Sequence, residues 1–340
     1  YVDNSECSLS FTYDGMNRVL TTTDCFGNTI EYEYDAAGNI TRIIYEPGKE
    51  VDYTYDGDNR LISVKDFNGN ITSYTYRPDG LLDRVDNANG TWVTYSYDGA
   101  GRLTGLENSG PGGTIASYSY TLDALGNHTA ETVNEPMTAP QLVSDTVSCT
   151  YNSKNQLISD GDNTYSYDGN GNLAAVSGSD NLTFSFDSQN RLREIYGDIT
   201  STFKYDAFGN RRSAMRAGTE TRYVLDIVRG MSKVLYETDS SGNVKYYYVY
   251  GLGLVSRVKP NGTTQYYHFN SGGSTVALSD MSGSVVASYS YGPFGRLIDN
   301  VGGEDNPFRF VGQYGVMAET EELYYMRARY YDSRFGIFLS

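Results

Sequence analysis

The stretch Tyr53-Thr54-Tyr55-Asp56-Gly57-Asp58-Asn59-Arg60-Leu61 carries the pattern that decides the fold of this chain. Residues i and i+2 share one face of a β-strand, so Tyr53 and Tyr55 would point one way and Thr54 the other. The Asp after the second aromatic residue can cap a tight turn through its side chain, and Gly or Asn tolerates the left-handed backbone that such turns need. The stretch therefore predicts a strand followed by a reversal of the chain.

The same pattern recurs with a fixed period. Its second aromatic residue falls every 21 residues in the first part of the chain, at Tyr13, Tyr34, Tyr55, Tyr76 and Tyr97. A second turn lies midway through each unit, as in Asp66-Phe67-Asn68-Gly69-Asn70. Each unit then holds two strands and two short turns of ordinary length. We expect a continuous antiparallel meander in which each unit buries its apolar face against its neighbours.

The regularity of the pattern divides the chain into stretches without separating domains. We predict one domain over residues 1–340: regular 21-residue repeats in 1–106, irregular loops in 107–148, shorter and divergent repeats in 149–300, and a distinct terminal segment in 301–340. The predicted loops include the Gly/Pro-rich stretches 108–113 and 135–140. Nothing in the composition marks a linker to a second domain.

The fold class follows from the number of predicted strands. At about ten residues per strand the chain makes roughly thirty strands, and a flat sheet of that size would be about 150 Å wide. Open twisted sheets rarely exceed about ten strands without curling. We therefore predict an all-β fold in which a long curled antiparallel sheet forms a spiral shell or cage. A β-propeller is the alternative, but its blades would need alternate repeats to differ, and the first five repeats show no alternation.

Composition excludes some classes of function. The chain has 340 residues, 37 of them Gly and 33 Tyr, with a formal charge of -16. Binding to nucleic acid is built on Lys and Arg, so we expect no nucleic-acid partner. The acidic surface is either simply solvated or attracts a basic partner.

We find no run of 18 apolar residues, hence no transmembrane segment, and no initiator Met or signal-like segment, so we expect a piece of a longer protein.

Three cysteines, Cys7, Cys25 and Cys149, do not have the dense, even spacing of a disulfide scaffold. The sequence allows a Cys7–Cys25 bridge without indicating one. Cys149 takes the place of the first aromatic residue in Cys149-Thr150-Tyr151-Asn152. We expect it to be a packed thiol, not a reactive one.

The sequence offers no catalytic constellation. The two histidines, His128 and His268, have no Cys or Glu at ligand spacing, which favours structural roles. A calcium site wants six or more oxygens, whereas each repeat turn offers one carboxylate, so the repeat aspartates are interpreted as turn caps. We assign no catalytic, cofactor-binding or metal-ligating residue and expect no cofactor. The tyrosine rows could stack on sugars or grip a protein, although cross-strand pairing explains them as well.

The repeats, read as Y-x-Y-D-x-x-G-N/R-L, resemble the YD repeats of the Rhs family, found in bacterial polymorphic toxins, insecticidal toxin-complex subunits and teneurin shells. The terminal stretches Pro307–Gly315, Leu323–Asp332 and Gly336–Ser340 resemble the Rhs-associated core. They depart from it at Ser333, where Pro is common, and at Ile337, where a basic residue is frequent.

The resemblance implies a hollow β shell that encloses a variable toxic segment on its C-terminal side. In toxin members that segment is released by an aspartyl self-cleavage just after the core. Asp332 could belong to a pair of carboxylates, but the segment that carries the cleavage chemistry would lie beyond residue 340, so we expect no enzyme activity here. The expected function is a non-enzymatic shell, secreted or at the bacterial cell surface, whose partner is a C-terminal cargo or toxin segment of the same polypeptide. The alternative is a cell-surface adhesin or carbohydrate-binding module with a glycan or protein partner.

Overall fold

The computed structural model describes residues 7–137, 146–302 and 305–340, which form three antiparallel sheets with almost no helix. Every strand within a sheet pairs with its neighbour in sequence. The first sheet contains 12 strands: β1 (Ser10–Tyr13), β2 (Val19–Thr23), β3 (Thr29–Tyr34), β4 (Ile40–Glu46), β5 (Lys49–Tyr55), β6 (Leu61–Lys65), β7 (Ile71–Tyr76), β8 (Leu82–Asp86), β9 (Trp92–Tyr97), β10 (Leu103–Gly110), β11 (Gly113–Leu122) and β12 (His128–Asn134).

The second sheet contains 16 strands and the third contains four. The second consists of β13 (Thr150–Tyr151), β14 (Leu157–Ser159), β15 (Asn163–Tyr167), β16 (Leu173–Gly178), β17 (Asn181–Phe186), β18 (Leu192–Gly197), β19 (Ser201–Tyr205), β20 (Arg211–Arg216), β21 (Thr219–Asp226), β22 (Lys233–Thr238), β23 (Val244–Tyr250), β24 (Leu254–Val258), β25 (Thr264–Phe269), β26 (Thr275–Ser279), β27 (Val285–Tyr291) and β28 (Leu297–Val301). After the short 3-10 helix η1 (Gly312–Tyr314), the third sheet consists of β29 (Met317–Ala318), β30 (Leu323–Met326), β31 (Arg329–Asp332) and β32 (Ile337–Phe338).

The turn after β5 shows how the repeat reverses the chain. The backbone N–H of Asp56 donates to the carbonyl of Arg60 at 3.0 Å, and Asn59 has a left-handed φ of 61°. The Oδ1 atom of Asp56 accepts the N–H groups of Asp58 and Arg60, both at 2.9 Å, while Arg60 Nε donates to Oδ2 at 2.7 Å. These bonds, led by that of the Arg60 backbone, lower the pKa of Asp56. The carboxylate thus closes the turn, as the sequence predicts.

The second aromatic residue of the repeat ties one hairpin to the previous one. In β5 the strand register shifts between Thr54 and Tyr55, and the Tyr55 hydroxyl donates to the carbonyl of Ile40 at 2.9 Å. Equivalent bonds, each spanning 15 residues, run from Tyr34 to Val19, from Tyr76 to Leu61 and from Tyr97 to Leu82. Tyr53, in contrast, is fully packed with 4% exposure.

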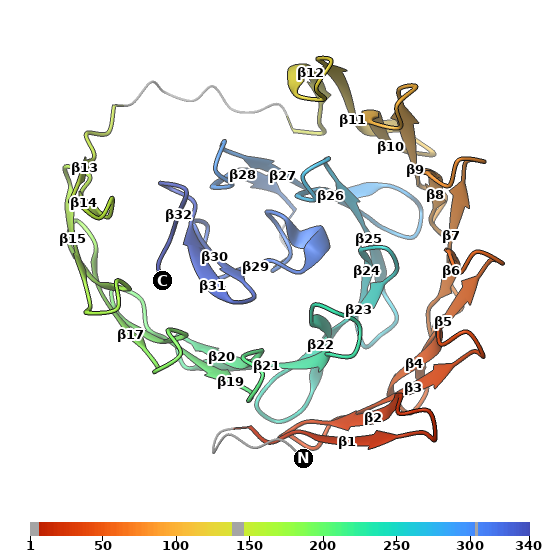
Figure 1. The fold of residues 1–340 in the computed structure, drawn as a ribbon, viewed down its shortest axis with the longest axis horizontal. Coiled ribbons are helices and arrows are strands. Elements are labelled where there is room, and N and C mark those ends of the chain that lie inside the picture. The colour runs from red at the N-terminus through yellow and green to blue at the C-terminus, as the bar shows by residue number, and fades with distance from the viewer. Residues whose placement is uncertain (1–6, 138–145, 303–304) are drawn as a thin grey trace.

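The sheets form a spiral (Figure 1). The first sheet is an outer arc, and the later strands of the second sheet, from β21 to β28, lie along its inner side. Hydrogen bonds join the two turns of the spiral: Tyr32 Oη donates to Asp226 Oδ1 at 3.1 Å, and Tyr45 Oη donates to the carbonyl of Tyr248 at 2.9 Å. The main apolar core, which includes Tyr53 and Tyr250, is shared by residues of both turns. The prediction of a curled antiparallel shell is confirmed, and the propeller alternative is not.

Two details differ from the sequence analysis. Most of residues 107–134, expected as loops, belong to β10, β11 and β12. The stretch Gly110–Gly113 is a tight hairpin turn. In the ten-residue strand β11, Tyr118 and Tyr120 both lie on the buried face. The predicted loop at 135–140 lies partly outside the described residues, and the division into stretches remains a prediction. Cys7 and Cys25, for which the sequence indicated no bridge, form a disulfide because the pairing of β1 with β2, which places Ser10 opposite Thr23, brings them together.

Candidate functional site

The terminal segment, residues 305–340, lies inside the spiral (Figure 1). It contacts strands far back in the sequence: the N–H of Leu173 in β16 donates to the carbonyl of Leu339 at 2.8 Å. Thr275 in β26 donates its N–H to the carbonyl of Arg309 at 2.9 Å, and Tyr324 Oη donates to the carbonyl of Gly295 at 2.7 Å. Ser340 therefore lies within the curve of the second sheet.

A buried ion-pair cluster joins this segment to β20. Glu319 accepts hydrogen bonds from Arg211 and from Arg216, the latter at 2.6 Å, and its side chain is only 3% exposed. Burial alone would raise the pKa of Glu319, but the charges and hydrogen bonds of the two arginines outweigh it and lower that pKa. Arg211 also stacks on Tyr325 of the same segment, with its guanidinium carbon 4.0 Å from the ring centroid. The cluster holds a charge pair that is costly to separate.

A second cluster holds the end of the segment. Arg334 pairs with Asp332 at 2.8 Å and with Asp180, in the turn after β16, at 2.8 Å. Glu322 lies 3.4 Å from the same guanidinium. Asp332, singled out in the sequence as half of a pair of carboxylates, is thus an ion-pair partner of Arg334 in the described residues.

Beside the Glu319 cluster, a polar cavity of about 310 Å³ lies between the terminal segment and β20–β23. Glu237 of β22 lies on its wall and accepts a hydrogen bond from Tyr248 Oη at 3.1 Å. Burial raises the pKa of Glu237 to about 7, although Arg216 and Lys245 act in the opposite direction. The other ionisable residues on its wall include Lys245, Asp305 and Glu319, and Glu319 is already paired with Arg216.

The two histidines do not form a site. His268 in β25 is fully buried and its Nε2 lies 2.8 Å from Ser279 Oγ, while burial lowers its pKa to about 4. His128 begins β12, where its ring packs 4.7 Å from that of Tyr120. Within the described ranges, no group of three or more His, Cys, Asp or Glu side chains is arranged to hold a metal ion.

The tyrosine rows have little free surface for a ligand. Most repeat tyrosines are buried, or donate their hydroxyl to a backbone carbonyl as Tyr55 does. The more exposed ones, Tyr13, Tyr151, Tyr196 and Tyr314, come from distant strands and from η1. Cys149 is partly buried against the main core, as expected of a packed thiol. Glycan binding remains a prediction that these contacts do not favour.

Sequence reasoning missed the residues that hold the terminal segment. Arg211 and Glu319 are 108 residues apart. Arg211 stands where the repeat motif has Leu, five residues after Asp206, and Glu319 lies outside the motif. The only signal was the Arg211-Arg212 pair directly after a turn, in a strand whose other residues are mostly buried. A charged side chain on the buried face of a strand needs an ion-pair partner, but the sequence does not identify the residue that provides it.

Comparison with known proteins agrees with this architecture. The family described as "Teneurin YD-shell" matches residues 1–129 and 92–340, which together cover the chain. A tRNA3(Ser)-specific nuclease WapA of Bacillus spizizenii is 34% identical over 242 residues, 67% of this chain, and the tRNA nuclease WapA of Bacillus subtilis is 33% identical over the same length. The chain spans only 10% of either relative.

Solved structures support the fold. The crystal structure of TcdB2-TccC3 superposes with a TM-score of 0.57 at 18% identity, and the Photorhabdus luminescens Tc holotoxin pore with 0.58 at 18% identity. In both, 98% of this chain is covered and 20% of the other chain. No helix among the described residues is long and apolar enough to span a membrane. With its hairpin repeats, its two-turn spiral and a family match along its length, the chain belongs to the teneurin YD-shell family.

Proposed function

We propose that this chain is a non-enzymatic shell that encloses and presents a polypeptide cargo, a toxin, joined to its C-terminal side. The observation that carries the proposal is the position of Ser340 inside the spiral, with Leu339 bonded to β16 of the inner wall. A segment attached there would start within the shell. The Glu319 and Arg334 clusters fix the terminal segment on the same inner side.

The comparisons give this proposal its toxin context. The relatives that match are named as tRNA nucleases, and they are about ten times longer than the aligned stretch. A nuclease domain outside the aligned part would be the cargo, and the shell itself would carry no catalytic group. Because disulfides persist in oxidising compartments, the Cys7–Cys25 bridge supports a secreted or cell-surface location.

Protection of a fused peptide from a protease tests the proposal. A short flexible peptide with one protease site is fused after Ser340, and the same peptide is fused before Tyr1 in a matched control. If the shell encloses the peptide fused after Ser340, the C-terminal site is cut many times more slowly than the N-terminal one under native conditions. Cleavage is monitored by mass spectrometry.

Denaturation provides the internal standard for this experiment. In urea both fusions should be cut at the same rate, which shows that the peptide itself is equally susceptible. Equal rates under native conditions would contradict enclosure, and the chain would then be a scaffold whose cargo lies outside.

A further inference from the structure

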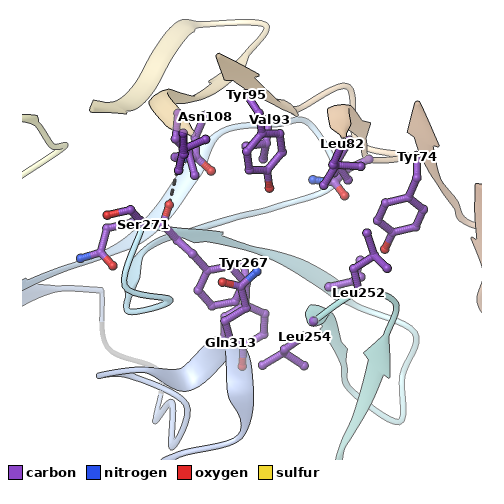
Figure 2. Close-up of a pocket in the computed structure, with 18 of the residues that line it drawn as sticks. Tyr74, Leu82, Val93, Tyr95, Asn108, Leu252, Leu254, Tyr267, Ser271 and Gln313 are labelled. Carbon is purple, nitrogen blue, oxygen red and sulfur yellow. Dashed lines mark hydrogen bonds between the residues drawn. The ribbon is translucent and has the colours of Figure 1, made fainter. Parts of the chain in front are cut away.

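A cavity of about 360 Å³ lies between the two turns of the spiral (Figure 2). Its outer wall comes from β7–β10 and its inner wall from β24, β25 and the loop before β24, with Gln313 and Tyr314 of η1 completing it. Elsewhere the two turns contact each other directly, as where Asn89 Nδ2 donates to Ser279 Oγ at 2.8 Å. The cavity is therefore a local opening in a packed interface.

Uncharged side chains line the cavity. Aromatic rings such as Tyr95 and Tyr267 face it together with aliphatic groups such as Val93 and Leu254 (Figure 2). Among the described residues that line it, none carries a charge, and only a few Asn, Gln and Ser side chains are polar. Apolar walls with a few placed polar groups are typical of sites for small molecules. A charged ligand would find no counter-ion there.

Asn108 gives the cavity a specific polar feature. Its side chain is 1% exposed, and its Nδ2 donates to the carbonyl of Phe269 across the interface at 3.0 Å. Its Oδ1 is buried and has no hydrogen-bond partner among the residues that the structure describes. A buried acceptor left unpaired is costly, so it favours any occupant that can donate a hydrogen bond.

Asn89, at the next hairpin contact along the same interface, shows the contrast. Its Oδ1 accepts both the N–H and the hydroxyl of Thr91, at 3.1 and 2.7 Å, and its Nδ2 bonds to Ser279 and to the carbonyl of Asp280. Both the oxygen and the nitrogen of the Asn89 side-chain amide therefore have hydrogen-bond partners. The unpaired Oδ1 of Asn108, in contrast, belongs to a residue on the cavity wall.

We propose that this cavity binds a small, uncharged, mainly apolar molecule that donates one hydrogen bond to Asn108 Oδ1. A ring compound with a single N–H or O–H fits this chemistry, since its faces pack on the tyrosine and leucine walls. The volume is ample for one, because an apolar protein cavity of about 150 Å³ already accommodates benzene. The site is independent of any cargo, as it lies between the turns of the shell.

Calorimetric titration of the whole chain with indole tests the proposal. Indole is a neutral bicyclic ring with one N–H, and 1-methylindole is the matched probe without it. We expect saturable 1:1 binding of indole and about tenfold weaker binding of 1-methylindole, as expected for one buried hydrogen bond. In Asn108→Ala the two probes should bind equally. Asn134→Ala, an exposed change on β12, should keep the preference.

Filling the cavity locates the site. Val93→Phe should abolish indole binding, and Val255→Phe serves the same purpose if the first variant does not fold as judged by circular dichroism. The proposal is overturned if indole shows no saturable binding up to its solubility limit, which would mean that water alone fills the space. Binding that survives in a folded cavity-filled variant, or a wild type that does not distinguish the two probes, overturns it as well.

Discussion

At the scale of the residue, tyrosine has two roles in each repeat, and its position decides which. The first tyrosine of the motif, such as Tyr53, is buried between the turns of the spiral. The second, such as Tyr55, is half-buried and bonds to the carbonyl of the preceding repeat. The polar residue between them faces solvent, so one tripeptide supplies both the core and the connection between hairpins.

Substitutions in β5 should separate these roles. Tyr55→Phe removes one hydrogen bond and should lower the free energy of unfolding by about 1 kcal/mol. Tyr55→Ala also removes the ring and should cost about 2 kcal/mol or more. Thr54→Ala, on the exposed side, should stay within about 0.5 kcal/mol. Urea unfolding measures all three, and similar small effects for Tyr55→Ala and Thr54→Ala would show that the assigned strand faces are wrong.

Two buried titratable residues should give the shell opposite pH dependences. Burial raises the pKa of Glu237 to about 7, above its ordinary 4.5, so its stabilising contribution is full below pH 4.5 and is lost as pH rises through 7. Compared with Glu237→Gln, the wild type should therefore lose stability between about pH 5 and 8. Urea unfolding at a series of pH values measures this, and parallel curves for the two proteins would contradict it.

His268 is the control of opposite sign. Burial lowers its pKa from 6.5 to about 4, so its contribution is present above pH 6.5 and is lost as pH falls through 4. Relative to His268→Gln, the wild type should gain stability as pH rises from 4 to 6.5. If the free energy of unfolding changes with pH in the same way for Glu237→Gln and His268→Gln, neither residue titrates as described.

At the scale of the element, the Asp turn is the unit that most repeats reuse, and Asp206 is a fully buried example. Its Oδ1 accepts the N–H groups of Phe208 and Asn210, and its Oδ2 pairs with Arg212 at 2.8 Å, with both side chains almost fully buried. Asp56 makes the same backbone bonds at the surface of the outer turn. The two turns share the same backbone hydrogen bonds, and the burial of the Asp side chain determines how much each turn contributes to stability.

Asp206→Ala should be one of the most destabilising single changes in the chain. It removes the turn cap and leaves Arg212 buried without its ion-pair partner, which costs about 3–5 kcal/mol when such a pair is broken. Asp56→Ala is the matched control and should cost clearly less, because Arg60 remains in contact with solvent. Differential scanning calorimetry checks the difference. Equal shifts in Tm would mean that burial of the Asp206 pair has no energetic consequence.

The elements could be predicted from the sequence because their signals are local. The two-residue period of a strand places Tyr53 and Tyr55 on the same face, and the turn from Asp56 to Arg60 closes within five residues. The register shift beside Tyr55 was missed, since a bulge leaves no mark in an alternating pattern. The prediction of a loop around Asn108–Gly113 was wrong for a similar reason, because a Gly-rich stretch can be either a long loop or a tight hairpin.

At the scale of the whole molecule, the contacts that define the shell join residues about 190–200 positions apart, such as Tyr32 with Asp226 and Tyr45 with Tyr248. No local pattern encodes which repeat meets which. Curling followed from the number of strands alone, whereas the pairing of turns, the cavity beside Asn108 and the burial of Glu319 depend on the pitch of the spiral. Those features needed the structure.

The Glu319 cluster makes the position of the terminal segment testable. Glu319→Ala removes the carboxylate that Arg211 and Arg216 share, and it leaves Arg211, 3% exposed, without its ion-pair partner. We expect residues 305–340 to separate more readily from β20 and to be cut by a protease sooner than the rest of the chain. Glu321→Ala, two residues on and exposed, is the control and should leave the cleavage pattern unchanged. Mass spectrometry of the early fragments identifies the cut sites. If Glu319→Ala is instead cut first in the outer hairpins β1–β12, the ion pairs stabilise the spiral as a whole, and the terminal segment stays inside through its apolar and backbone contacts alone.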